Sequence, residues 1–313
     1  MKAFSSACFV TGAHVDLAGR LDAAPILHVS NPGRFERIPG GAGLNAASAA
    51  AALGLSCAIA GPVGDDADAG ELKRLAAARG IGDALVSLQG RRTGSYTSIM
   101  APDGEMVIGL ADLSIHEATD ADWLMAHCGE ALGHADLWLL STNLTEATLD
   151  KLANRAGNRV VAAATISPAK AVRLRPVLAR LDLIFTNLAE ARAITGLEGA
   201  DGERLAAALA TSGIRAGTIS AAGGPLFWWD GDAIGALAPP PVETIADVNG
   251  AGDALAGAAL AALSRGLAME QAARFGIAAA QLTLSVREPF HAGLSWAPVE
   301  ARAGEIAPAG KGR

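Results

Sequence analysis

Cysteine and aromatic residues are scarce in this chain of 313 residues, and long apolar runs are missing. The three cysteines are scattered, with neither metal-ligand spacing nor a disulfide pattern, which predicts a reducing, cytoplasmic location. No apolar run reaches the ~18 residues of a membrane span, and the apolar N-terminus fits a first strand better than a signal peptide. A net charge of −7 without a basic tract argues against nucleic-acid binding. We therefore expect a cytoplasmic protein without a membrane or nucleic-acid partner.

Alanine and glycine supply much of the apolar content, which is 51% of the chain although only 4% of its residues are aromatic. This composition suits helices that pack closely on a sheet. Short apolar strands alternate with helical segments, which predicts an α/β fold with a mainly parallel central sheet and helices on both faces. We expect one domain over residues 1–313, with strands of this sheet at residues 7–10, 57–60, 137–140, 160–164, 183–185 and 217–220.

Two segments, about residues 12–38 and 92–113, depart from this alternation. The first contains the turn sequence Asn31-Pro32-Gly33, and the second has the pattern of a β-hairpin around Pro102-Asp103-Gly104. Together they predict a small β-sheet outside the main one. A lid over a binding site is the natural role of such a sheet.

A glycine-rich turn, residues 247–253, opens an alanine-rich helix near the C-terminal end. The N-terminus of a helix has unpaired N–H groups and a partial positive charge, so it attracts anions. The small residues Gly250, Ala251 and Gly252 let a phosphoryl group approach the backbone. A carboxylate beside such a site can take a proton from an attacking hydroxyl, which makes Asp253 a candidate base. The alternative is an aspartate that only caps the helix.

A second glycine turn, residues 39–45, opens another alanine-rich helix. Its Asn45 can both donate and accept hydrogen bonds, as the recognition of paired hydroxyls requires. Asp16 follows the first predicted strand, and ligands of open α/β sheets gather at the carboxyl ends of strands. Two such turns suggest the two halves of one ligand site, although a turn aspartate and an ordinary helix cap are the alternatives.

Asn187 and Glu190 lie three residues apart at the start of a predicted helix, so they share one face. Such an oxygen-rich pair could orient Mg²⁺ through water, because Mg²⁺ keeps several waters and needs few protein ligands. The alternative is a capping box, with Asn187 as the N-cap and Glu190 at the third helical position.

Three motifs together, residues 40–47, 187–190 and 250–253, resemble the PfkB (ribokinase-like) family of carbohydrate and nucleoside kinases. The resemblance covers residues 12 to about 295. It implies a ribokinase-like fold, ATP and Mg²⁺ as cofactors, and phosphorylation of a primary hydroxyl of a small-molecule acceptor. The roles that it implies are Asp253 as base, Gly250, Ala251 and Gly252 as the phosphoryl-binding turn, Asp16, Gly41 and Asn45 as sugar contacts, and Asn187 and Glu190 as organisers of Mg²⁺ and phosphates.

Softer similarities, among them residues 93–97 and 167–170, resemble the branch of this family that phosphorylates the nucleoside pseudouridine. This branch implies transfer to the 5′-hydroxyl, with the hairpin covering the bound nucleoside. The additional acceptor contacts that we expect come from Tyr96, Thr97, Asp112 and Asn143. The family also implies a homodimer formed through the small sheet and, near Asp247, a monovalent cation such as K⁺.

Several positions depart from the family pattern. Asn249 replaces the usual Thr, His14 the usual Asn, and Ala164 the usual Asp. The nucleotide loop at residues 222–225 ends in a proline, which removes an N–H group. Nucleotide contacts are still expected from Ser220, Gly223 and Asn249. Two alternatives stay open, a related kinase for another sugar or nucleoside and a nucleoside-binding regulator without turnover.

Overall fold

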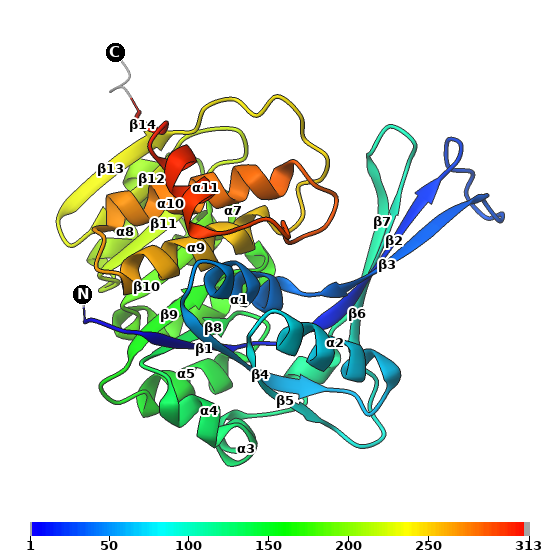
Figure 1. Cartoon of the computed structure of the whole chain (residues 1–313), viewed down its shortest axis with the longest axis horizontal. Helices are drawn as coiled ribbons and strands as arrows, with labels where there is room; N and C mark the ends of the chain where they lie inside the picture. The colour runs from blue at the N-terminus through cyan, green and yellow to red at the C-terminus, as the bar shows by residue number, and fades with distance from the viewer. Residues whose placement is uncertain (1, 310–313) are drawn as a thin grey trace.

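One large sheet forms the centre of the molecule in the computed structural model, which describes residues 2–309 (Figure 1). Its parallel strands, in their order across the sheet, are β5 (Gly82–Ser87), β4 (Ser56–Val63), β1 (Ser6–Val10), β8 (Leu137–Ser141), β9 (Val160–Ala164), β10 (Leu183–Asn187) and β11 (Ala216–Ser220). An antiparallel edge follows, with β12 (Leu226–Asp230), β13 (Ala233–Ala238) and β14 (Ala307–Pro308). The predicted mainly parallel sheet is confirmed.

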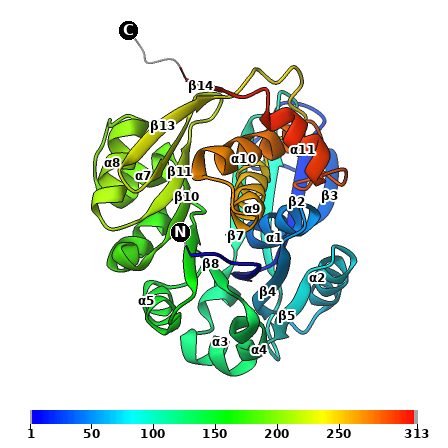
Figure 2. The ribbon, with the colours of Figure 1, turned by 60° about the vertical axis from the view of Figure 1, so that its left-hand side comes forward.

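Helices cover both faces of this sheet and enclose a hydrophobic core on each (Figure 2). One core contains residues of α1 (Ala42–Ala52), α2 (Ala67–Ala78), α9 (Ala251–Ser264), α10 (Met269–Leu284) and α11 (Trp296–Ala303). The other contains residues of α3 (Ala121–His127), α4 (Gly129–His134), α5 (Glu146–Arg155), α6 (Pro168–Ala171), η2 (Val172–Arg180), α7 (Leu188–Thr195) and α8 (Gly202–Thr211). Among residues 2–309, no helix is both long and apolar enough to cross a membrane.

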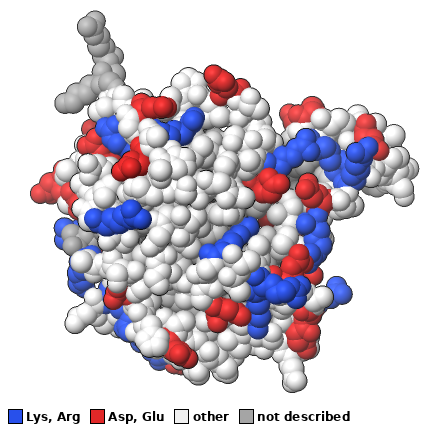
Figure 3. Space-filling model, in the orientation of Figure 1, with Lys and Arg blue, Asp and Glu red and all other residues white. Residues whose placement is uncertain are grey.

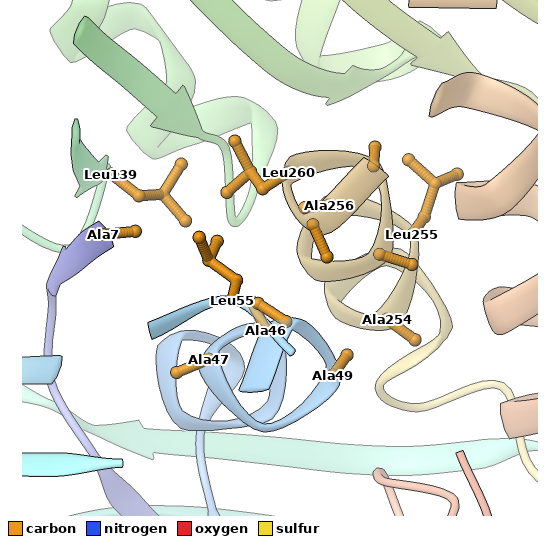
Figure 4. Close-up of a cluster of buried hydrophobic side chains, with 14 of the residues drawn as sticks. Ala7, Ala46, Ala47, Ala49, Leu55, Leu139, Ala254, Leu255, Ala256 and Leu260 are labelled. Atoms are coloured by element: carbon orange, nitrogen blue, oxygen red, sulfur yellow. The ribbon is translucent and has the colours of Figure 1, made fainter. Parts of the chain in front are cut away.

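The abundance of alanine is explained by α1 and α9, which lie side by side with small side chains between them (Figure 4). A Cβ on Gly257 of α9 would lie 2.2 Å from the carbonyl oxygen of Ala46 in α1, so only glycine allows this approach. Both helices begin at a glycine turn. Their close packing therefore brings two helix N-termini together, which a hydrogen bond from Asn45 to Asp253 confirms.

A second sheet projects from the main body (Figure 1). Its four strands have the order β3 (Gly33–Gly40), β2 (His14–Leu21), β6 (Gly94–Met100) and β7 (Met106–Asp112). The pairing of β2 with β6 is parallel, and the other two pairings are antiparallel. Arg37 of β3 forms ion pairs with Asp68 and Glu71 of α2, which tie this small sheet to the main body. Acidic and basic side chains are mixed along it (Figure 3).

Candidate active site

The start of α9 depends on a glycine. Gly250 is the N-cap of this helix with a φ of +77°, and a Cβ there would lie 1.9 Å from the carbonyl oxygen of Pro289. Gly252, in the next position but one, lines a cavity of about 210 Å³. The cavity therefore borders the N-terminus of α9. This helix end can bind an anion, because the first N–H groups of a helix have no partners within the helix.

Asp253 lies in the first turn of α9 and lines the same cavity. Burial raises the pKa of its carboxyl group to about 7, although a hydrogen bond from Asn45 and the nearby His14 act in the opposite direction. The Nδ2 group of Asn45 donates this bond to Oδ2 of Asp253 over 3.1 Å. A pKa close to neutrality suits a group that must exchange a proton during turnover. Its position on the cavity wall and its raised pKa therefore keep Asp253 a candidate general base.

Asn45, in α1, and Asp16, in β2 of the small sheet, both lie near Asp253. Asn45 is buried, and its Oδ1 atom is sealed from solvent and has no hydrogen-bond partner among residues 2–309. The carboxylate of Asp16 lies 3.3 Å from Nε2 of His14. Gly41, with a φ of +98°, packs on the same imidazole, because a Cβ there would lie 2.7 Å from Nδ1 of His14. His14 thus supports two of the predicted sugar-binding residues.

The cavity lies at the carboxyl ends of β8, β9, β10 and β11, where open α/β sheets bind ligands. Asn187 and Glu190 line it at the start of α7. They also form the predicted capping box, in which the Asn187 side chain accepts from the Glu190 N–H and the Glu190 carboxylate accepts from the Asn187 N–H. Capping and ligand binding are therefore compatible here, since the capping box itself lies on the cavity wall.

The side-chain oxygen atoms on this wall of the cavity suit a hydrated magnesium ion. Within residues 2–309 no group of three or more His, Cys, Asp or Glu side chains could enclose a metal ion. Asn187 and Glu190 instead offer a few oxygen atoms beside the helix end that can bind phosphate. Mg²⁺ usually keeps several waters and takes one or two carboxylates together with substrate phosphates.

Of the three predicted nucleotide contacts, one lines the cavity and two lie outside its wall. Ser220, at the end of β11, lines the cavity. Gly223, with a φ of +70°, lies in the exposed turn that follows β11, and it is not part of the cavity wall. Asn249 is also exposed and donates its backbone N–H to Asp247, which shapes the turn before α9.

The small sheet separates three residues that the sequence groups together. Tyr96 is directly opposite Asp16 in the pairing of β2 with β6, so their side chains share one face. Thr97 is the next residue and points to the other face. Asp112 is opposite Ser95, which also places it on the face of Thr97, and its side chain is exposed. Successive side chains of a strand point to opposite faces of the sheet, so residues of one hairpin need not share a face.

A further polar cluster lies beside the site. The Oδ1 atom of buried Asn143 accepts a hydrogen bond of 2.7 Å from Nζ of Lys170, and burial lowers the pKa of this lysine. Lys170 belongs to the segment 167–170 that resembles the family, but no local pattern reveals its contact with Asn143.

No local sequence pattern singles out His116. It is buried against Gly12 and Gly94, where a Cβ on Gly12 would overlap its ring, and neither ring nitrogen has a partner among residues 2–309. Burial, with smaller effects of His14 and Lys170, lowers the pKa of His116 to about 3. The imidazole is therefore neutral, and it occupies the junction between the small sheet and the main body.

Comparison with known proteins agrees with this geometry. Residues 9–292 match the family described as "pfkB family carbohydrate kinase". The pseudouridine kinase of Escherichia coli (strain K12) is 26% identical over 280 residues, which cover 88% of this chain and 89% of that protein. The 1-phosphofructokinase of Rhodobacter capsulatus is 33% identical over 254 residues, which cover 76% of this chain and 77% of that protein.

Solved structures show the same fold. A carbohydrate kinase from Agrobacterium tumefaciens matches with a TM-score of 0.86 and 34% identity, covering 97% of this chain and 98% of that one. Ribokinase from Thermotoga maritima matches with a TM-score of 0.82 and 22% identity, covering 96% of this chain and all of that one, 100%. The fold is therefore ribokinase-like.

Proposed function

The chain belongs to the pfkB family of carbohydrate kinases, and we propose that it transfers the γ-phosphoryl group of ATP to the 5′-hydroxyl of pseudouridine. Membership makes it a phosphotransferase with an alcohol group as acceptor. One observation carries the assignment of the reacting group. Asp253, a carboxylate with a pKa of about 7, lies on the cavity wall at the N-terminus of a helix.

In the proposed reaction Asp253 accepts the proton of the acceptor hydroxyl as the oxygen attacks the γ-phosphorus, and the bond between this phosphorus and the bridging oxygen breaks, so that ADP leaves. The N–H groups at the start of α9, in the turn formed by Gly250, Ala251 and Gly252, stabilise the charge on the transferring group. Their positions are fixed before the substrate binds, because Gly250 is packed on Pro289 and the helix is buried behind them. Fixed dipoles of this kind need no reorganisation during the reaction.

The nucleotide would lie along the ends of β10 and β11. Asn187 and Glu190 would hold the water shell of Mg²⁺, which neutralises phosphate charge when it is bound. Ser220 supplies a hydroxyl on the cavity wall, and Gly223 and Asn249 would contact the nucleotide from the two flanking turns. A monovalent cation near Asp247 is part of the same proposal, because this carboxylate shapes the turn before α9.

The acceptor would lie between Asp253 and the small sheet. Asp16, Gly41 and Asn45 would hold the ribose hydroxyls, and Tyr96 would cover the nucleoside because it shares a face with Asp16. The polar pair Asn143 and Lys170 suits a base with several hydrogen-bonding groups, as pseudouridine has. Thr97 and Asp112 have no role in this proposal, since they point to the other face of the sheet.

The experiment that tests the proposal measures ADP release with Mg-ATP and pseudouridine, uridine, adenosine or ribose side by side. We expect turnover with pseudouridine. Turnover with another acceptor alone would overturn the assignment of pseudouridine and retain the kinase. Tight binding of a nucleoside without ADP release from any acceptor would favour a binding protein that has lost turnover.

We also propose that the small sheet binds a second copy of this chain. The outer face, opposite to Asp16, carries five apolar side chains beside polar ones: Leu17, Phe35, Ile99, Ile108 and Leu110. Among them Phe35 is 70% exposed, Ile108 62% and Leu110 68%. Exposed apolar groups that lie together on one surface usually mark an interface. Two identical faces of this kind can cover each other in a symmetric dimer.

The mass in solution tests this arrangement. Wild-type protein should elute from a sizing column with light-scattering detection as a dimer, whereas Leu110→Lys should elute as a monomer. Ile245→Lys is the control, because Ile245 is 58% exposed but lies in the loop before α9. A monomeric wild type, or an unchanged mass in Leu110→Lys, would contradict the proposed dimer.

A further inference from the structure

Glu190 is held more firmly than a capping box requires. A capping box needs only the bond from the N-cap N–H to the glutamate, which here runs from Asn187 to Oε2 over 3.1 Å. The same Oε2 atom also accepts a hydrogen bond of 2.5 Å from the hydroxyl of Thr165. The hydroxyl of Thr186 lies 3.4 Å from this oxygen. The glutamate is only 4% exposed. Helix capping therefore leaves the contact with Thr165 unexplained.

The position of Thr165 is fixed by the sheet. It follows the last residue of β9, and its backbone N–H donates to the carbonyl oxygen of Phe185 in β10 over 3.1 Å. Its side chain lines the cavity together with Glu190. The preceding residue, Ala164, has no polar side-chain atom. In this chain the threonine hydroxyl is thus the polar group that the end of β9 offers to Glu190.

The two carboxylate oxygens of Glu190 are not equivalent. Oε2 is engaged by the donors just described. Oε1 accepts no hydrogen bond within residues 2–309, and it is not among the polar atoms sealed from solvent. Since Glu190 lines the cavity, Oε1 is the oxygen left for a ligand.

We propose that Thr165 is a positioning residue for phosphoryl transfer, because its hydroxyl fixes the carboxylate of Glu190 so that Oε1 stays available to hydrated magnesium. This inference rests on the role of Glu190 in the proposed function. It does not depend on which acceptor is used. Outer-shell hydrogen bonds to a metal-binding carboxylate typically change metal affinity or activity by about 10–100-fold when they are removed.

The test compares Thr165→Val, which keeps the shape of the side chain, with Thr165→Ser, which keeps the hydroxyl. Calorimetry measures the binding of ADP with and without Mg²⁺, so the result does not require an acceptor. Mg²⁺ should increase the affinity for ADP in the wild type. In Thr165→Val we expect this increase to be about tenfold smaller. Thr165→Ser should retain it. Thr195→Val is the matched control, because Thr195 lies at the other end of α7 and its hydroxyl bonds to the carbonyl oxygen of Ala191.

A double-mutant cycle separates this role from a general structural one. If Thr165 acts through Glu190, Thr165→Val should have no further effect on magnesium-dependent ADP binding in a Glu190→Gln background. An undiminished effect in that background would overturn the proposal, as would equal magnesium dependence in wild type and Thr165→Val. If pseudouridine is not phosphorylated but the binding cycle behaves as expected, the acceptor assignment fails and the role of Thr165 stands.

Discussion

The two sides of the acceptor site are built in different ways. On the phosphoryl-transfer side, hydrogen bonds run from Asn45 to Asp253 and from Thr165 to Glu190, and these residues lie on or next to elements anchored in the two cores. On the small sheet, the hydroxyl of Tyr96 makes a single hydrogen bond among residues 2–309, to the sulfur of Met106 at 3.6 Å. The phosphoryl-transfer side is therefore prearranged, whereas the small sheet can adapt to the acceptor.

This contrast predicts that the largest effect comes from the prearranged side. Asp253→Asn should lower kcat by at least ~100-fold, the lower end for the loss of a general base. The KM of the nucleoside should change little, because the amide keeps the size of the side chain and can still bond to Asn45. Steady-state kinetics with pseudouridine and Mg-ATP measure both constants. Turnover close to that of the wild type would remove Asp253 from the mechanism.

The stability of the same variant shows whether it is folded. Burial raises the pKa of Asp253 in the folded protein, so the free energy of unfolding of the wild type falls as pH rises from the ordinary value of 3.8 through about 7. Asn cannot ionise and escapes this loss. Asp253→Asn should therefore melt at a higher temperature than wild type above pH 7 and show no such gain near pH 4. Loss of activity with a lower melting temperature at both pH values would indicate misfolding.

The pH dependence of turnover gives the second prediction. The wild-type kcat should rise with pH through about 7, because protonated Asp253 cannot accept a proton. The hydrogen bond from Asn45 lowers the pKa of Asp253, so Asn45→Leu should move this acid limb upward. The shift should be about one pH unit, since a hydrogen bond to a charged group contributes about 1.5 kcal/mol and one unit is about 1.4 kcal/mol.

A matched variant controls for general disturbance of α1. Ser48→Ala removes a hydroxyl of the same helix that donates to the carbonyl oxygen of Leu44, accepts from Arg79 and makes no hydrogen bond to Asp253. Its acid limb should coincide with that of the wild type. The other groups that influence Asp253, namely His14, Asp16 and Glu190, are unchanged in both variants. An acid limb in Asn45→Leu that stays at the wild-type pH would mean that Asp253 does not control it.

The same contrast explains what could be predicted from the sequence. The two glycine turns and the pairing of Asn187 with Glu190 are local patterns, in which residues a few positions apart must meet. The parallel sheet follows from the repeated alternation of strands and helices. The contact of Thr165 with Glu190 spans 25 residues and that of Asn45 with Asp253 spans 208, so only the folded chain reveals them.

The register of the small sheet also could not be predicted from the sequence. A hairpin pattern shows which residues form strands, but the face to which each side chain points depends on pairing with a distant strand. The pairing of β2 with β6 joins residues about eighty positions apart, and it alone places Tyr96 with Asp16. The sequence alone groups Thr97 and Asp112 with Tyr96, because one hairpin carries all three.

The smallest predicted effects test this assignment of faces. Tyr96→Phe should raise the KM of pseudouridine by about 2–10-fold with little change in kcat, because the loss of one hydrogen bond costs about 0.5–1.5 kcal/mol. Thr97→Val and Asp112→Asn should leave KM within twofold of the wild type, as is usual for surface changes of about 0.5 kcal/mol or less. Kinetics at saturating Mg-ATP measure all three. If Thr97→Val or Asp112→Asn raised KM as much as Tyr96→Phe, the outer face of the small sheet would have to reach the acceptor, and the division between its two faces would be wrong.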